Sequence, residues 1–307
     1  MPVKQKGVAL VLALLIFALA TIVAVMIMGR ADSEFRRAER LLYGEQALQY
    51  VFGAEQWVMQ ILYRDRRDST TDHLGEDWAV NLPPLPVDGG VVVGRLEDLS
   101  GRFNLNNLVN EDGTASEPHM RQFQRLLQVL GLEEQVSVAA VVDFIDPGSE
   151  PTSPDGAEDG VYLTLQPPHR TPNRPLAGLS EIALLRDFDP AVLPILAPHV
   201  TALPVRTPLN VNTLSSPLVM SLADGISEPL AEEIVANHAD GSAGSLQQFT
   251  ALLGLEPEPG VGLALSSDWF LLTVRVNIGS MDLTMYSLLE RQADGRTRVV
   301  SRQRTPW

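Results

Sequence analysis

The junction between residues 1–7 and the apolar run that follows constrains this chain more than any other feature. Residues 8–28 form a predominantly apolar run of twenty-one residues without charge, preceded by a short basic leader that ends in Gly7. At about 1.5 Å per helical residue this run is about 32 Å long, which matches a hydrocarbon core of about 30 Å. No small-residue signal-peptidase site follows Met28. Cleavage after Gly7 would instead remove the leader and leave the helix in place, with Val8 as its first residue; an uncut membrane anchor is the alternative.

The helix is expected to continue beyond the membrane. Residues 31–64 contain no proline, and apolar residues recur at helical spacing at Leu41, Leu48, Val51, Phe52, Met59 and Leu62. We therefore predict a single helix of about 55 residues, with its first half in lipid and its second half packed on a globular head. A separate anchor and head would more often be joined by a linker rich in proline, glycine and serine, and this chain has none here.

The predicted fold class is α+β, with the long N-terminal helix lying on a small antiparallel sheet. Strands are predicted at residues 91–96, 270–278, 283–291 and 297–302, with turns at Gly279-Ser280 and at residues 293–295. Residues 68–90 are interpreted as a polar, proline-bearing connection. The predicted organisation is a leader (1–7), a membrane half-helix (8–28), an α/β head (29–102 plus 266–307) and an inserted helical domain (103–265).

The predicted insertion contains an internal duplication. The hexapeptide at 103–108 recurs at 209–214, and each copy is followed by a helix, a glycine turn at Gly131 or Gly225, and a second helix ending near Asp143 or His238. The two units, 103–145 and 208–255, are similar to SAM or helix-hairpin-helix modules. DNA-binding examples of the helix-hairpin-helix module carry Lys and Arg near the turn, but residues 205–266 carry one basic and seven acidic residues in a chain of net charge −15. Nucleic acid is therefore excluded as a partner, and the units are predicted to serve for packing.

An acidic segment in the first half of the insertion is a candidate metal site. Its six carboxylates lie among prolines and glycines, and they are Asp143, Asp146, Glu150, Asp155, Glu158 and Asp159. Ca²⁺ takes six to eight oxygen ligands, which clustered carboxylates and carbonyls of an irregular loop can supply. The spacing is not that of an EF-hand. Calcium is thus the candidate cofactor, and a solvated acidic loop is the alternative.

No arrangement of residues predicts catalysis. The chain has no cysteine, its five histidines are scattered, and it contains neither a P-loop nor a dinucleotide-binding fingerprint. A non-enzymatic protein is therefore predicted.

The Gly7 junction, the retained helix and four short motifs (102–106, 143–146, 156–159 and 208–213) together resemble the K component of the general secretion pathway. This is the family of large minor pseudopilins of type II secretion. The resemblance implies that a prepilin peptidase cleaves after Gly7 and methylates Val8. It also implies a single-pass protein of the inner membrane with its head in the periplasm, and calcium in that head. One departure is Gly148, where family members commonly carry a third aspartate; Glu150 is expected to substitute.

The resemblance further implies a heteromeric tip with the I and J minor pseudopilins, extending to H and the major pseudopilin. Most pseudopilins carry glutamate as the fifth residue after cleavage, where this chain has Leu12. In pilins that carboxylate pairs with the amine of a neighbouring subunit, and without a partner it would be costly in lipid. The expected function is therefore structural, capping or nucleating the pseudopilus tip during export of folded proteins across the outer membrane. A membrane-tethered periplasmic binding module that uses the helical repeat is the alternative.

Overall fold

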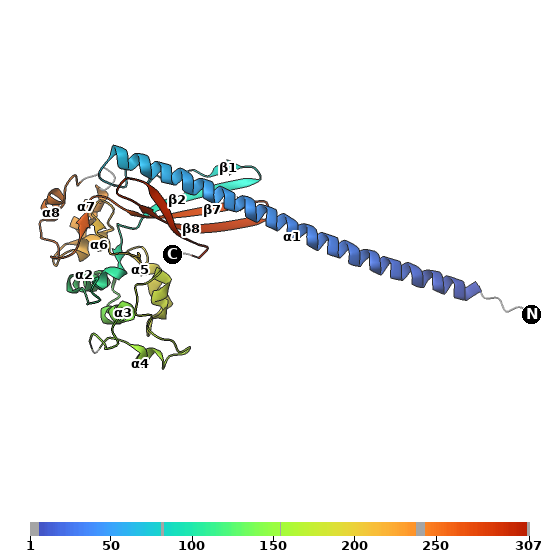
Figure 1. Cartoon of the computed structure of the whole chain (residues 1–307), viewed down its shortest axis with the longest axis horizontal. Coiled ribbons are helices and arrows are strands. Elements are labelled where there is room, and N and C mark those ends of the chain that lie inside the picture. The colour runs from blue at the N-terminus through green and yellow to red at the C-terminus, as the bar shows by residue number, and fades with distance from the viewer. Residues whose placement is uncertain (1–5, 81–82, 154, 238–242, 306–307) are drawn as a thin grey trace, which may run out of the picture.

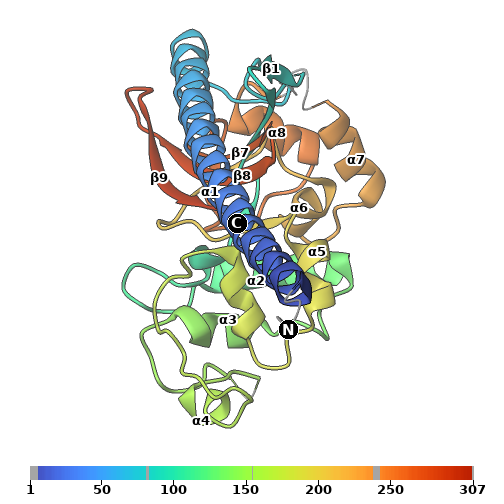
Figure 2. The ribbon, with the colours of Figure 1, turned by 90° about the vertical axis from the view of Figure 1, so that its right-hand side faces the viewer.

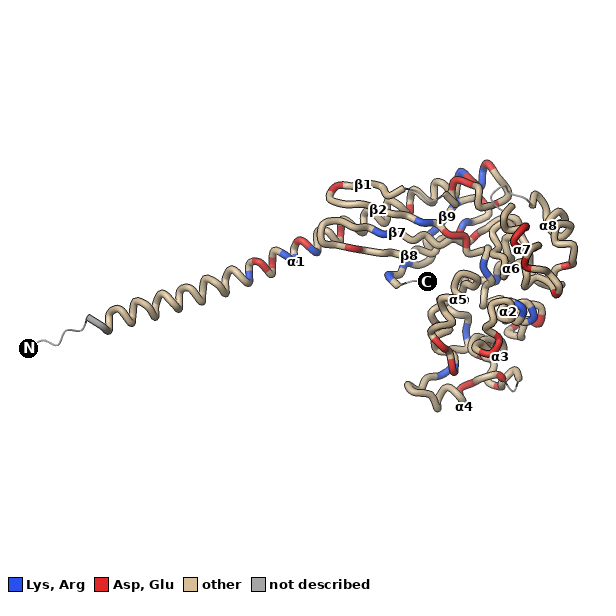
Figure 3. Tube along the Cα trace, turned by 180° about the vertical axis from the view of Figure 1, so that it is seen from behind, with Lys and Arg blue, Asp and Glu red and all other residues tan. Residues whose placement is uncertain are grey.

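One helix dominates the shape of the molecule. The computed structural model describes residues 6–80, 83–153, 155–237 and 243–305. Helix α1 (Lys6–Asp68) runs without a break for 63 residues, and its N-terminal part projects far beyond the rest of the chain (Figure 1). After Lys6, the next charged residue of the helix is Arg30, and the projecting part before it carries no charge (Figure 3). The prediction of one continuous helix is confirmed, although the helix begins before the apolar run and is longer than predicted.

A five-stranded antiparallel sheet lies under the C-terminal half of α1. The strand order is β1-β2-β7-β8-β9, comprising β1 (Leu85–Val87), β2 (Gly90–Asp98), β7 (Trp269–Ile278), β8 (Met281–Arg291) and β9 (Thr297–Gln303). The four predicted strands are confirmed. The interpretation of 68–90 as connection alone was wrong, because β1 pairs with β2 through Pro86 opposite Val91. Proline cannot donate to a ladder, so it suits this edge strand.

Helix α1 packs on the sheet only from about Tyr43 onward. Its buried side chains Ala47, Val51, Val58 and Leu62 share a core with residues of β2, β7 and β8. Figure 2 shows the helix crossing these strands. Two residues predicted for the buried face are instead exposed, Leu41 at 62% and Phe52 at 39%. Leu41 precedes the packed part of the helix, while Phe52 lies under the guanidinium of Arg302, 5.3 Å from its ring centroid.

Between β2 and β7 the chain forms a second mass of short helices below the sheet (Figure 1). The first half contains β3 (Phe103–Asn104), η1 (Leu105–Leu108), α2 (Glu117–Leu130), α3 (Val138–Ile145), α4 (Asp159–Tyr162), η2 (Leu179–Leu184), η3 (Pro190–Val192), α5 (Leu193–Leu196) and β4 (Val200–Thr201). The second contains β5 (Leu209–Asn210), α6 (Ser216–Ser221), α7 (Glu228–Ala236), α8 (Leu246–Leu253) and β6 (Leu263–Ala264). Helix α7 ends at Ala236; His238, the predicted end, lies outside the described residues. The predicted α+β class, with a long helix, an antiparallel sheet and helical regions, is confirmed.

The two hexapeptides that recur in the sequence adopt the same local structure. Strand β3 pairs in parallel with β4, and β5 pairs in parallel with β6. In each copy the first asparagine caps the turn: Asn104 Oδ1 accepts from the Asn106 amide, and Asn210 Oδ1 accepts from the Asn212 amide. An asparagine that bonds the backbone two residues ahead stabilises such a turn. Related sequence therefore gives related backbone at both positions.

Candidate assembly helix and candidate cation-binding loop

The N-terminal part of α1 contains the predicted processing and assembly residues. Gly7 and Val8 lie in the first turn of the helix, and the predicted leader before Lys6 lies outside the described residues. Val8 is 71% exposed and Leu12 is 56% exposed. The most apolar stretch of this helix has a mean hydropathy of 3.1, and none of it is buried against the rest of the molecule. By length and composition this segment can cross a membrane.

The C-terminal half of α1 is joined to the sheet by an ion pair that the sequence analysis missed. Glu55 is 1% exposed, and it accepts two hydrogen bonds from Arg302 on β9, both of 2.8 Å, and one of 2.7 Å from Ser287 on β8. The bond with Glu55 raises the pKa of Arg302. Three elements thus converge on one helical carboxylate, which fixes the rotation of α1 on the sheet.

Asp143 is a buried acceptor for backbone amides of the acidic segment. It lies near the end of α3 and is fully buried, and its two oxygens accept from the amides of Thr152 at 2.9 Å and Ala157 at 2.8 Å. A β-carbon at Gly156 would overlap Asp143 Oδ2, so glycine is required there. Asp146 Oδ1 accepts from the Gly148 amide at 2.8 Å. The loop therefore folds around the two carboxylates at its start.

Glu158 and Asp159 lie at the start of α4, close enough to Asp143 and Asp146 for the charges to interact. Thr171 donates its hydroxyl to both carboxylates. Glu158 is 5% exposed, and among the described residues its Oε1 has no hydrogen-bond partner. The buried Oδ1 of Asn173 also lacks a partner, while the Nδ2 of the same residue donates to the Gly148 carbonyl at 2.8 Å. Buried oxygens without donors are the ligand type that a hard cation takes.

The electrostatics of this loop also suit a cation. Burial raises the pKa of Asp146, and nearby Asp143 adds to that shift. Burial likewise raises the pKa of Glu158, with further contributions from Asp143, Asp146 and Asp159. Four of the six predicted ligands therefore repel one another across one region, and a bound cation would relieve that repulsion. The chemistry of these side chains fits a Ca²⁺ ion. In the described part of the chain, however, no three carboxylates of this segment have ligand oxygens within 4.8 Å of one another.

The remaining two predicted ligands lie on the surface of the loop. The side chains of Glu150 and Asp155 are exposed, and the Asp155 carbonyl is occupied by donors from Ser137 and Arg186. Thr171 and Asn173, which the structure adds to the loop, were not predicted. They lie at least twelve residues beyond the acidic segment, and no motif in the sequence marks them.

Two serine–histidine contacts in the molecule are structural. Ser116 Oγ lies 2.8 Å from His119 Nδ1, and Ser215 Oγ lies 2.7 Å from His199 Nδ1. Burial, together with the nearby charge of Arg206, lowers the pKa of His119 to about 4. Burial also lowers the pKa of His199, with Arg102 contributing. A hydrolytic triad needs a carboxylate beside the imidazole, so a neighbouring cation is the opposite of the required arrangement.

Comparison with known proteins gives one consistent result. Two family models described as "Type II secretion system (T2SS), protein K" match residues 101–205 and 209–265. Proteins called type II secretion system protein K from Pseudomonas aeruginosa and Pectobacterium carotovorum are 36% and 34% identical to this chain. These matches cover 97% and 98% of this chain, and 92% and 96% of the two relatives.

A solved structure is similar as well. It is the crystal structure of the GspK-GspI-GspJ complex from the type 2 secretion system of enterotoxigenic Escherichia coli, in which the matching chain has a TM-score of 0.76 and 25% identity. The match covers 88% of this chain and all of that one.

Proposed function

Because this chain belongs to the type II secretion system protein K family, and is thus a minor pseudopilin component, we propose that it forms the tip of the pseudopilus. In this role it is non-enzymatic. It caps or nucleates the fibre that acts in export of folded proteins across the outer membrane. The observation that carries the proposal is α1, which combines a membrane-length apolar segment with a fifth residue after Gly7 that has no carboxylate.

The exposed surface of α1 supports assembly with other subunits. Beyond the uncharged run, Phe35 is 70% exposed, Leu41 is 62% exposed and Leu42 is 71% exposed. They follow Arg30 in the chain and precede Tyr43, from which α1 packs on the sheet. Lipid does not reach far past the first charged turns, so these side chains need protein partners to leave water.

The proposed partners are the I and J minor pseudopilins. The similar solved chain belongs to a complex with those two proteins, and its match extends over 88% of this chain. Further contacts with H and the major pseudopilin would follow along the fibre. Prepilin peptidase would cleave after Gly7 and methylate Val8. Before assembly the chain would be anchored in the inner membrane by residues 8–28, with its head in the periplasm.

Leu12 and the bulk of the head support an end position. Leu12 offers no carboxylate to the amine of a preceding subunit, while the amine of Val8 remains able to pair with a following one. Contact is thus possible on one side. The helical mass between β2 and β7 extends well to one side of the sheet (Figures 1 and 2). In a helical array of identical heads this mass would collide with neighbours.

Calcium is proposed as a structural ligand of the acidic segment. Asp143, Asp146, Glu158 and Asp159 would hold it, because Glu158 Oε1 is buried with no donor in the described part of the chain and burial raises the pKa values of Asp146 and Glu158. When bound, the ion would supply charge neutralisation and cross-link the end of α3 to the start of α4.

Co-purification of the full chain with I and J tests this function. The three proteins would be co-expressed with prepilin peptidase, extracted from membranes in detergent and isolated through a tag on this chain. We expect a discrete complex with one copy of each protein, and no homopolymer. The matched variant Leu12→Glu restores a carboxylate at the fifth position, and we expect it to self-associate more than the parent chain. Isolation of the parent chain without I and J would favour the tethered binding module and contradict the proposal.

A further inference from the structure

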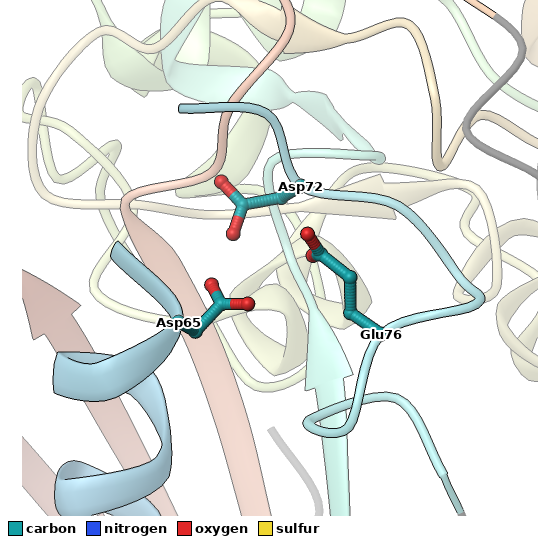
Figure 4. A group of neighbouring side chains, drawn as sticks. All are labelled: Asp65, Asp72 and Glu76. Carbon is teal, nitrogen blue, oxygen red and sulfur yellow. The ribbon is translucent and has the colours of Figure 1, made fainter. Parts of the chain in front are cut away.

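Three carboxylates converge at the end of α1, away from the acidic segment described above. Asp65 lies in the last turns of the helix, and Asp72 and Glu76 lie on the loop that follows it. One oxygen from each residue lies within 4.8 Å of the others. Figure 4 shows the three side chains pointing toward a common centre. Three carboxylates at this separation repel one another strongly unless a positive charge lies among them.

Asp72 provides an independent observation that points to a ligand at this centre. This residue is 1% exposed. Its Oδ2 accepts from the Ser267 amide at 2.7 Å and from Arg291 Nη2. Its Oδ1 is buried and has no hydrogen-bond partner among the described residues. Leaving a buried carboxylate oxygen without a donor is costly, so an occupant of the site is expected to satisfy it.

The surrounding charges do not balance the three carboxylates. Arg291 is 1% exposed at its side chain and pairs with Asp65 at 2.9 Å and with Asp72. Two further acids, Asp98 and Asp268, face the same region. Arg66 acts on Asp268, and His73 Nε2 lies 3.8 Å from Glu76 Oε1. Counting only the trio and Arg291, three negative charges face one positive charge, which leaves −2, the charge that one divalent cation neutralises.

We propose that Asp65, Asp72 and Glu76 bind a divalent, oxygen-preferring cation of the Ca²⁺ class at this junction. The Trp78 indole and the His73 amide both donate to Glu76 Oε2, at 2.6 Å and 3.0 Å, which leaves Oε1 for the ion. Asp72 accepts from the amide of Ser267, which lies two residues before β7 begins at Trp269. The cation therefore joins the end of α1 to the point where the helical mass re-enters the sheet.

A shared proton is the competing occupant. Burial, together with the nearby charges of Glu76 and Asp72, raises the pKa of Asp65 to about 7. A protonated Asp65 could donate to Asp72 in place of a cation. The two occupants differ in one respect that can be measured: a proton needs only the aspartate pair, whereas a cation also needs Glu76.

Terbium luminescence tests the site directly. The full chain in detergent would be stripped with chelator and titrated with Tb³⁺ at pH 7.5, with excitation at 295 nm, where only tryptophan absorbs appreciably. Trp78 is bonded to Glu76 and is therefore placed to sensitise an ion bound there. We expect sensitised emission that Ca²⁺ displaces. Glu76→Gln keeps the acceptor for Trp78 and removes one charge, and it should weaken Tb³⁺ and Ca²⁺ binding at least about tenfold.

The matched control is the double variant Glu158→Gln, Asp159→Asn, which alters only the acidic segment and should leave the tryptophan-sensitised signal unchanged. Far-UV circular dichroism in chelator would verify that each variant is folded. Absence of sensitised emission from the parent chain would overturn the proposal. Equal Ca²⁺ affinity in the parent and in folded Glu76→Gln would also overturn it, in favour of the shared proton.

Discussion

Removing the charge of Glu55 should loosen α1 from the sheet by a measurable amount. This carboxylate is 1% exposed and accepts two bonds from Arg302 and one from Ser287. Glu55→Gln retains the shape and one acceptor oxygen but removes the charge. Hydrogen bonds to charged groups contribute about 1.5–3 kcal/mol and neutral ones about 0.5–1.5 kcal/mol, so two bonds lose about 2 kcal/mol.

Solvent reduces that figure for the Gln variant. The Arg302 side chain is 42% exposed, so water replaces part of the hydrogen bonding that it loses. We therefore expect Glu55→Gln to lower the unfolding free energy by about 1 kcal/mol. Glu55→Ala also leaves the fully buried Ser287 hydroxyl without its partner, which costs a further 1–3 kcal/mol or so. The expected loss of unfolding free energy for the Ala variant is therefore about 3 kcal/mol.

Urea denaturation of the full chain in detergent measures these values, with the buried Trp78 and Trp269 as fluorescent probes of the head. Asp282→Asn is the control, because Asp282 and its partner Arg275 are 46% and 63% exposed at their side chains. We expect the control to lose at most about 0.5 kcal/mol. If Glu55→Ala unfolds at the same urea concentration as the control, the ion pair does not fix the helix on the sheet.

Three further predictions concern processing, metal and pH. Mass spectrometry of the N-terminus from secretion-active cells should find N-methylated Val8, and bulky replacements of Gly7 should retain the longer form; an intact Met1 would contradict processing. Ca²⁺ should raise the melting temperature of the full chain, and Glu158→Gln with Asp159→Asn should reduce that increase; identical melting of the parent in Ca²⁺ and in chelator would exclude the acidic-segment site. Burial raises the pKa of Asp98 to about 6, so the folded state holds a proton that the unfolded state releases near pH 4. Stability should therefore fall as pH rises from 4 to 6, by up to about 1.4 kcal/mol per pH unit, and Asp98→Asn should flatten this part of the profile; an unchanged profile would contradict the assignment.

The sequence predicted those parts of the fold that depend on local pattern. The uncharged run, the uninterrupted helical spacing and the alternating strands were sufficient for α1 and for four of the five strands. Strand β1 was not predicted because its three residues include Pro86. A proline indicates the end of a strand unless the strand is known to lie at the edge of the sheet. The exposure of Leu41 was not predicted for a similar reason. Helical spacing shows which face of a helix is apolar, but not the residue from which that face packs on the sheet.

The candidate sites were less predictable because their parts come from distant segments. The carboxylates of the acidic segment could be listed, but not the burial that separates Asp143 from the exposed Glu150. Thr171 joins that loop from outside any motif. The three carboxylates at the end of α1 could not be predicted as a site for the same reason. Their charge is partly compensated by Arg291, which lies more than two hundred residues away in the chain. The sequence shows which side chains are charged, but only the tertiary structure shows which opposite charges lie beside them.

Locating this chain within an assembled pseudopilus tests whether it forms the tip. A small tag on an exposed loop of the head, detected by gold labelling of pseudopili and by quantitative mass spectrometry, would give both place and copy number. We expect one copy for each pseudopilus, located at the outer end. Many copies distributed along the shaft would contradict the tip assignment while leaving the family membership intact.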